Sequence, residues 1–313
     1  MNAPPFPDVF RIEPSSLCNL RCCHCFTGQN PGIGGIMKHE TFNKVMDEII
    51  YHKPRVVVLY HGGEPFLNPN LLNMIRTVKD AKVPKTKLNT NGMLVDDLRG
   101  IVKSGLDFIV FSIDGRTPHE NNDIRTGSNY AKVRNTIQNL VRIKKEMECD
   151  HPHITIVNVQ MPTKVELETP THNAPDFLLR DFKGLDVELK MNRAIYWAGL
   201  DLKHSGFFLN DSTKTNNHCA TSTETITIRW NGDVVPCCLD IQNWCVMGNI
   251  FEHRLEEIWR NDNYNRLRES LFNMEFLPLC ENCHFVRVGR YLMQTNGANI
   301  RTTPSDHNQS NDW

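Results

Sequence analysis

The chain has 313 residues, which suffices for one large domain or for a large domain with a smaller companion. Charged residues make up 23% and hydrophobic residues 40%, as expected of an ordinary soluble globular protein, and the formal net charge of -1 gives no general electrostatic reason to expect nucleic-acid or membrane binding. Because the sequence shows neither a secretion signal at its start nor a run of about 18 apolar residues, we expect a cytoplasmic protein without a membrane span.

Short apolar runs alternate with longer amphipathic ones from residue 8 to about residue 200. In chain order, we expect strands at 9–13, 55–61, 85–91, 108–114, 153–161 and 186–193. The helices expected between them cover 39–52, 71–81, 96–105 and 129–147. Strands that alternate with helices predict a parallel sheet with right-handed crossovers, in a barrel or in an open doubly wound sheet.

The alternation ends near residue 200. Residues 209–223 are polar and loop-like, and 224–238 predict a β-hairpin that turns at Asn231 and Gly232. One helix is expected at 253–272, before a final pair of cysteines. We therefore expect three parts: a core domain at 1–205, a small α+β module at 206–295, and a polar, disordered tail at 296–313.

Eleven cysteines are placed unevenly along the chain. Cys18, Cys22, Cys23 and Cys25 lie within eight positions, and Cys149 stands alone with an expected structural role. The last third carries Cys219, Cys237, Cys238, Cys245, Cys280 and Cys283. In a reducing compartment, clustered thiols more often bind metal or carry out redox chemistry than form disulfides.

Cys18, Cys22 and Cys25 have C-x3-C-x2-C spacing. Three thiolates on one short loop can each hold one iron of a cubane [4Fe–4S] cluster, which leaves the fourth iron without a protein ligand. An open coordination position lets a small molecule bind the metal directly. A zinc site is the alternative, although zinc usually takes four ligands in two pairs.

Four further motifs stand near the ends of the expected strands. HGGEP at 61–65 follows the second strand, and NTNG at 89–92 ends the third. SIDG at 112–115 ends the fourth, and NDIRTG at 122–127 precedes the long helix. Active sites of barrel proteins lie at the carboxyl ends of the strands. Together with the cysteine triplet, these motifs resemble the radical S-adenosylmethionine (SAM) superfamily over roughly residues 8–200.

The resemblance implies a partial (β/α)6 TIM-like barrel that uses SAM. In that family the fourth iron chelates the methionine amino and carboxylate groups of SAM, and electron transfer cleaves the sulfonium to a 5′-deoxyadenosyl radical. The implied SAM-binding residues are Gly62, Gly63, Glu64, Pro65, Asn91, Ser112, Asp114 and Arg125. Glu64 would face the SAM amino group and Arg125 the carboxylate. Asp114 also fits a plain strand-end cap, Cys23 fits packing near the cluster, and the role of His24 is open.

The C-terminal cysteines resemble the auxiliary-cluster domains called SPASM and, in shortened form, twitch. The pattern comprises Cys219, Gly232, Cys237, Trp259, Cys280 and Cys283. Because further cysteines of a full SPASM domain are missing after Cys283, the resemblance implies one auxiliary [4Fe–4S] cluster, with Cys219, Cys237, Cys280 and Cys283 as ligands. Four protein ligands would suit this site to electron transfer. A zinc ribbon is the alternative, and the layout most resembles 2-deoxy-scyllo-inosamine dehydrogenase-like enzymes of antibiotic biosynthesis.

The expected reaction begins with hydrogen abstraction from a substrate C–H bond, and its outcome divides the hypotheses. Oxidation of the radical, with the auxiliary cluster as electron acceptor, gives a ketone from an aminocyclitol or sugar alcohol. Return of a hydrogen by Cys238 or Cys245 gives an epimer, although both also fit the role of small buried hydrophobic residues. Radical coupling gives a crosslinked peptide. The resemblance makes this outcome less favoured, because peptide maturases of the family often carry an additional peptide-recognition domain and only 17 residues precede the first cysteine here.

A non-enzymatic iron–sulfur electron carrier is a further alternative, but a carrier has no use for the Glu64 motif. The expected partners are a small-molecule or peptide substrate and an electron donor such as flavodoxin or ferredoxin. We expect the substrate between the barrel mouth and the C-terminal module, near Arg193, Tyr196, Trp197 and His204, each of which also fits a structural role.

Overall fold

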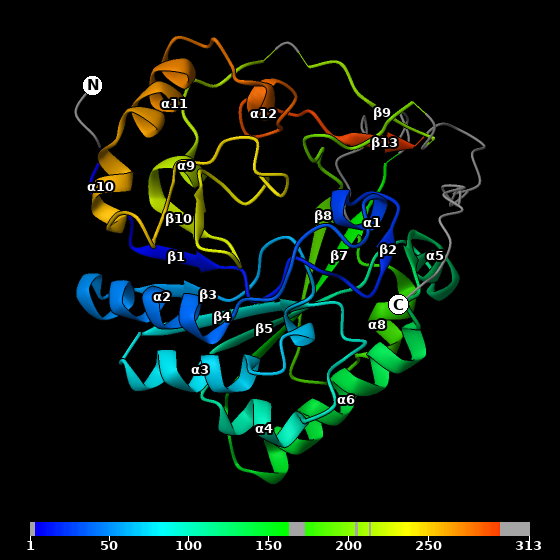
Figure 1. Cartoon of the computed structure of the whole chain (residues 1–313). Helices are drawn as coiled ribbons and strands as arrows, with labels where there is room; N and C mark the ends of the chain where they lie inside the picture. The colour runs from blue at the N-terminus through cyan, green and yellow to red at the C-terminus, as the bar shows by residue number, and fades with distance from the viewer. Residues whose placement is uncertain (1–3, 163–172, 204–205, 213, 295–313) are drawn as a thin grey trace, which may run out of the picture.

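A mixed sheet forms the centre of the protein (Figure 1). The computed structural model describes residues 4–162, 173–203, 206–212 and 214–294, and in these the strand order is β12-β11-β10-β1-β3-β4-β5-β7-β8. The run from β1 to β8 is parallel and comprises β1 (Val9–Ile12), β3 (Val56–Val58), β4 (Lys85–Thr90), β5 (Phe108–Ser112), β7 (His153–Gln160) and β8 (Glu188–Arg193). This arrangement confirms the expected α/β class with a partial (β/α)6 TIM-like barrel.

Helices cover the outer face of the parallel strands (Figure 1). They are α2 (His39–His52), α3 (Leu71–Asp80), α4 (Leu98–Lys103), α6 (Tyr130–Glu146) and α8 (Asp176–Asp181). Phe10 and Ile12 of β1 and Leu88 of β4 are fully buried in the apolar core that joins the sheet to these helices. Because side chains alternate along a strand, the residues next to these on each strand face the inside of the barrel. We call this inside the lumen.

Short elements follow the carboxyl ends of the strands. They are β2 (Arg21–Cys22), α1 (Phe26–Gln29), η1 (Pro65–Leu67), α5 (Pro118–Ile124) and β6 (Arg125–Thr126). β2 and β6 pair antiparallel, with Cys22 opposite Arg125. The cysteine loop is thereby tied to the NDIRTG motif, more than a hundred residues away in the sequence.

The C-terminal part extends the barrel sheet. Its elements are β9 (Phe207–Leu209), α9 (Ala220–Glu224), β10 (Thr225–Ile228), β11 (Asp233–Val235), β12 (Gly248–Asn249), α10 (Leu255–Arg260), α11 (Asp262–Phe272), α12 (Pro278–Glu281) and β13 (Leu292–Gln294). The expected hairpin is confirmed as β10 and β11, which pair antiparallel around Gly232. β10 also pairs parallel with β1, so that the hairpin continues the same sheet.

Two expectations for this part are corrected. The single helix expected at 253–272 is two helices, because Asn261 has an extended backbone (φ -74°, ψ 172°) and its side chain accepts a hydrogen bond from the Tyr264 amide, which caps α11. The stretch expected as loop at 209–223 begins in β9 and ends in α9. The tail expected at 296–313 lies outside the described residues. Among the described residues, no helix has the length and apolar character needed to cross a membrane.

Candidate functional site

The three cysteines of the triplet lie on the loop that follows β1. Cys25 donates its backbone N–H to the Cys22 carbonyl (3.2 Å), and the Leu20 amide donates to the Cys18 Sγ (3.5 Å). Burial raises the pKa of Cys18, and the Glu64 carboxylate and the Cys25 thiol raise it further. Burial likewise raises the pKa of Cys22, and Cys25 and Cys18 both add to the rise. The three thiols therefore lie close enough to influence one another electrostatically.

The HGGEP segment packs directly against this loop. A Cβ atom at Gly63 would lie 2.3 Å from the Leu17 carbonyl oxygen, so only glycine permits this approach. The Glu64 amide donates to the same Leu17 oxygen (2.8 Å), and the Thr27 hydroxyl donates to the Gly62 carbonyl (2.6 Å). Pro65 is buried at the first position of η1, where its missing N–H costs nothing.

Glu64 points from this segment toward the end of β4 and is almost fully buried. Its Oε1 accepts from the Thr90 hydroxyl (2.8 Å), and its Oε2 accepts from the Asn91 amide (2.8 Å). Burial raises the pKa of Glu64, while these donors oppose the rise. Asn91 in turn places its Nδ2 3.9 Å from the Cys18 Sγ. The structure thus brings together the triplet, HGGEP and NTNG.

Asp114 and Arg125 form a buried ion pair beside the triplet. Arg125 Nη1 donates to Asp114 Oδ2 (2.7 Å), and His24 Nε2 lies 3.5 Å from the same oxygen. Asp114 is therefore the internal partner of Arg125, and its contact with SAM stays a prediction. So does the contact of Arg125 with the SAM carboxylate, although Arg125 Nε is buried without a hydrogen-bond partner among the described residues. Ser112, half-buried at the end of β5, belongs to the lumen-facing side of that strand.

Sequence reasoning missed a second buried network at this edge of the sheet. Glu13, fully buried after β1, accepts from His61 Nδ1 and the Gly62 amide (both 3.0 Å) and from Arg229 Nε (3.0 Å). Burial raises the pKa of Glu13, but His61 and Arg229 outweigh this and lower it to about 2. The network links HGGEP to the β10–β11 hairpin. A glutamate at the end of an apolar strand is the feature of the sequence that could have indicated it.

The four predicted auxiliary ligands line one cavity. Cys219 directly precedes α9, Cys237 follows β11, and Cys280 and Cys283 lie in and after α12. The remaining walls are mainly apolar and include Leu239, Leu267, Leu271, Leu279, Phe285 and Val286. Burial raises the pKa of Cys283 to about 12, and the Cys219 thiol adds to the rise. A four-sulfur set with apolar walls fits a closed iron–sulfur cluster.

Among the described residues, no three His, Cys, Asp or Glu side chains come as close together as a single metal ion requires. A cubane carries one ligand at each iron corner and therefore spreads its thiolates more widely than one ion does.

The two candidate hydrogen donors lie in different surroundings. Burial raises the pKa of Cys238, which the Arg11 charge opposes, and Cys238 in turn raises the pKa of Tyr60. The Arg11 guanidinium carbon lies 5.8 Å from the centre of the Tyr60 ring. Cys245 donates its backbone amide to Asp240 Oδ2 (2.9 Å), and burial, followed by the Asp240 charge, raises its pKa to about 11. Only Cys238 of the two is electrostatically linked to lumen residues.

Three of the four residues expected near the substrate lie in the part of the chain that the structure describes, in different surroundings. The Arg193 guanidinium lies 5.3 Å from the centre of the Tyr291 ring, and Tyr196 and Trp197 are half-buried against two different apolar clusters. His204 lies outside the described residues. Their placement leaves the substrate-binding role of these four residues a prediction.

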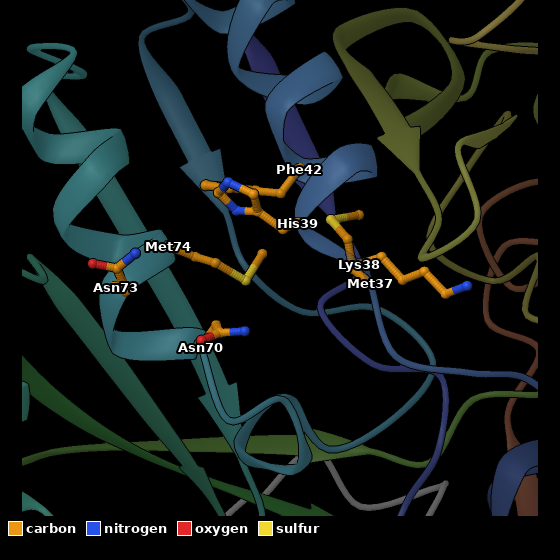
Figure 2. Close-up of a pocket in the computed structure, with 7 residues that line it drawn as sticks. All are labelled: Met37, Lys38, His39, Phe42, Asn70, Asn73 and Met74. Atoms are coloured by element: carbon orange, nitrogen blue, oxygen red, sulfur yellow. The ribbon is translucent and has the colours of Figure 1, made fainter.

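A separate pocket of about 290 Å³ lies where α2 and α3 begin. Figure 2 shows its lining side chains, which are Met37, Lys38, His39, Phe42, Asn70, Asn73 and Met74. No cysteine is among them, and the pocket lies on the helical layer outside the barrel. We therefore assign the chemistry to the cysteine sites.

Curated relatives share most or part of the sequence. A "Tungsten-containing aldehyde ferredoxin oxidoreductase cofactor-modifying protein" from Pyrococcus furiosus is 26% identical over 87% of this chain and 86% of its own length. A "Probable GTP 3',8-cyclase" from Methanococcus maripaludis is 29% identical over 43% of this chain and 45% of its own length. The chain thus spans less than half of that cyclase.

Solved structures share the fold. BtrN in complex with AdoMet and 2-DOIA has a TM-score of 0.57 at 17% identity, covering 90% of this chain and 94% of BtrN. Streptococcus suis SuiB bound to S-adenosylmethionine has a TM-score of 0.59 at 16% identity, covering 89% of this chain and 73% of SuiB. Native anSMEcpe with bound AdoMet has a TM-score of 0.60 at 17% identity, covering 91% of this chain and 93% of its own.

Two family models match the chain, one over the barrel residues and one over the C-terminal cysteines. The Radical SAM superfamily model matches residues 12–156, which contain the triplet, HGGEP and the Asp114–Arg125 pair. The SPASM iron–sulfur cluster-binding domain model matches residues 219–284, which contain all four cysteines of the apolar cavity. The chain is therefore a radical SAM enzyme with a C-terminal SPASM-type iron–sulfur domain.

Proposed function

We propose that this radical SAM enzyme removes a hydrogen atom from a C–H bond of a small polar substrate and oxidises it, with an aminocyclitol or sugar alcohol giving a ketone. The observation that carries the proposal is the hydrogen-bonded assembly of Cys18, Glu64 and Asn91 in a chain that also has a four-cysteine cavity. When bound at the triplet, a [4Fe–4S] cluster supplies the electron that cleaves SAM.

The chain's own residues bind and orient SAM in this proposal. Cys18, Cys22 and Cys25 hold the cluster. Glu64, fixed by three donors, presents its remaining lone pairs to the SAM ammonium group. Asp114 fixes the Arg125 guanidinium, and the unpartnered Nε of Arg125 is a donor suited to the SAM carboxylate. The buried setting strengthens these contacts by excluding water.

Besides removal of the hydrogen atom, the oxidation requires an acceptor for one electron and a base for one proton. SAM, together with a cluster held by Cys18, Cys22 and Cys25, would supply the chemistry that removes one hydrogen atom from the substrate carbon. The hydroxyl proton would go to a base and one electron to the C-terminal cluster site, which leaves a ketone. The cavity of Cys219, Cys237, Cys280 and Cys283 suits an electron-accepting cluster because it offers four sulfurs and no open position. A flavodoxin or ferredoxin would supply the electron that starts each cycle.

Iron and acid-labile sulfide after anaerobic reconstitution test the two cluster assignments. We expect about eight irons per chain, as two four-iron clusters require. A Cys280→Ala/Cys283→Ala variant should retain about four, and so should a Cys18→Ala/Cys22→Ala variant. Cys149→Ala is the matched control, because Cys149 belongs to neither site and should leave the content unchanged. Zinc in place of iron would contradict the proposal.

A radical epimerase is the second candidate, favoured by the electrostatic influence of Arg11, on the lumen side of β1, on the buried Cys238 thiol. In that case the Cys238 S–H would return a hydrogen atom to the substrate radical, and the Cys238 sulfur would regain one electron from the flavodoxin or ferredoxin and one proton from solvent, so that the substrate is not oxidised overall. Turnover in deuterated water distinguishes the two, because an epimer acquires deuterium at the reacting carbon and a ketone does not. Cys238→Ala would abolish the epimer, whereas Cys245→Ala is the matched control.

A further inference from the structure

The lumen side of the parallel strands carries positive charge. Arg11 on β1 and Lys87 on β4 occupy the same side, because the register pairs Arg11 with Val58 and Val58 with Lys87. Their immediate neighbours Phe10 and Leu88 face the opposite way, into the apolar core. Parallel strands are usually apolar on both faces. Basic side chains inside this sheet therefore need an explanation.

Arg11 has no counter-ion among the described residues. Its Nε and Nη1 atoms are buried without a hydrogen-bond partner, and its guanidinium carbon lies 5.8 Å from the centre of the Tyr60 ring. A ring face offsets only part of the loss of hydration of a cation. A guanidinium presents its donors in a planar fork that matches carboxylate and phosphate oxygens.

Lys87 is also without an ion pair in the part of the chain that the structure describes. Burial lowers its pKa, and the charges of Lys190 and Arg11 lower it further, whereas the Glu188 carboxylate opposes them. Glu188 is itself engaged, since its Oε2 lies 3.2 Å from Lys190 Nζ and accepts from the Thr155 hydroxyl (3.0 Å). Glu188 is thus shared between Lys190 and Lys87, while Arg11 has no carboxylate partner among the described residues, which leaves an excess of positive charge.

The position of this charge relative to the triplet follows from β4. Lys87, Asn89 and Asn91 succeed one another on the lumen side, and Asn91 contacts Cys18. At about 3.3 Å per residue in a parallel strand, Lys87 lies roughly 13 Å below Asn91. Between them the buried Asn89 Oδ1 has no hydrogen-bond partner among the described residues. A molecule that reaches from the cations toward the cluster would pass this amide.

We propose that the lumen binds an anionic substrate, whose phosphate or carboxylate group is held by Arg11 and Lys87 while a polar group contacts Asn89. This inference rests on the proposed function, because it concerns the substrate of the same site. The anionic group lies at the end of the substrate remote from the C–H bond that reacts. Among the substrates considered above, the charge favours an acidic or phosphorylated polyol over an aminocyclitol, whose ammonium group would face like charge.

Binding of four matched sugars to the SAM-loaded, reconstituted holoenzyme tests this by anaerobic calorimetry. Glucose is neutral, glucosamine is cationic, glucuronate carries a carboxylate and glucose 6-phosphate carries a phosphate. We expect at least one of the two anions to bind about tenfold more tightly than glucose, and glucosamine to bind least. Preference for glucose 6-phosphate or for glucuronate identifies which oxyanion the site takes. Equal or absent binding of all four, or preference for glucosamine, overturns the inference.

Variants locate the anion. Lys87→Gln should remove most of the preference for the anion over glucose, and Lys87→Arg should preserve it. Arg11→Lys keeps the positive charge on β1 and should weaken binding of the anion only a few-fold. Lys145→Gln, an exposed lysine of α6 on the outer face, is the matched control and should change nothing. An anion preference that survives in Lys87→Gln contradicts the assignment.

The proposed function and this inference fail separately. The calorimetric test needs no turnover, so it reports on the lumen even if the protein does not cleave SAM. Conversely, SAM cleavage by the wild-type protein together with no anion preference would retain the proposed function and remove only the inference.

Discussion

Glu64 is held in its orientation before any ligand arrives. The Thr90 hydroxyl and the Phe66 amide donate to one oxygen, and the Asn91 amide donates to the other, from two different elements. Such donors favour the ionised carboxylate, which burial alone would disfavour. A fixed carboxylate beside the cysteine triplet is suited to bind an ammonium group, which is the role that the SAM-binding proposal gives it.

We predict that Glu64→Gln weakens SAM binding. Loss of a buried, charge-assisted hydrogen bond costs about 1.5–3 kcal/mol, or roughly 10- to 150-fold in Kd. Equilibrium dialysis with labelled SAM on the reconstituted protein measures this. Glu252→Gln, at an exposed position beyond β12, is the control and should bind SAM normally. An unchanged Kd in Glu64→Gln would contradict the assigned role.

Glu13 is a second buried carboxylate held by hydrogen bonds, and it contributes to the stability of the fold. Its two oxygens receive hydrogen bonds from His61 and Arg229, all within the interior. Removing one member of a buried charge pair leaves the other uncompensated and costs about 3–5 kcal/mol. We therefore predict that Glu13→Gln lowers the free energy of unfolding by about this amount, measured by anaerobic urea titration followed by circular dichroism.

The pH dependence of this contribution has a definite sign. The pKa of Glu13 is lowered in the fold from 4.5 to about 2, so the stabilisation is fully present above 4.5 and is lost as the pH falls toward 2. The stability difference between wild type and Glu13→Gln should hold constant at neutral pH and shrink below about 4.5. A difference that instead grew on acidification would show that Glu13 is not held ionised.

At the scale of elements, the site depends on two loops in backbone contact. Gly63 approaches the carbonyl oxygens of Ser15 and Leu17 so closely that a methyl group would meet both. We predict that Gly63→Ala displaces the cysteine loop, and that the reconstituted protein loses about four of its irons while the C-terminal cluster remains. Iron analysis and the electron paramagnetic resonance signal of the reduced protein measure this.

Gly184→Asn is the control for that prediction. Gly184 has φ +75°, and no atom lies within 4 Å of the place that a Cβ would take there. Asparagine tolerates this left-handed conformation. The variant should retain full iron content. Full iron content in Gly63→Ala would contradict the proposed dependence of the first site on loop contact.

Sequence reasoning succeeds where the signal is local. The period of apolar residues predicts the strands and helices of the barrel, and the turn at Gly232 predicts the hairpin. The break at Asn261 was missed because the amphipathic pattern continues through it, while one side-chain cap ends the helix. Long-range pairs such as Asp114 with Arg125, or Glu13 with Arg229, depend on the tertiary fold and leave no local pattern.

At the scale of the whole molecule, one sheet joins the two parts of the chain. β10 pairs with β1 from Val9 to Ile12, and Arg229 just beyond β10 reaches Glu13. The sequence predicts a core domain and a smaller C-terminal module, and strands of both belong to one hydrogen-bonded sheet. Continuity ties the segment that carries Cys237, just after β11, to the barrel through β10 and β1.

This continuity predicts that the first 205 residues do not form a stable protein alone. Such a fragment exposes the whole edge of β1 and leaves Glu13 buried without Arg229. Exposed strand edges promote aggregation. Size-exclusion chromatography should show aggregates for the fragment and a discrete species for the full chain. A discrete, folded fragment would show that β10 is dispensable for the barrel.

The proposed chemistry depends above all on a cluster at Cys18, Cys22 and Cys25 that cleaves SAM. The most direct measurement is the formation of 5′-deoxyadenosine from SAM by the reconstituted protein under dithionite reduction. We expect product from wild type and from Cys280→Ala/Cys283→Ala, and none from Cys18→Ala/Cys22→Ala. No 5′-deoxyadenosine from a wild-type protein that carries both clusters, or equal amounts from the Cys18→Ala/Cys22→Ala variant, would contradict this assignment.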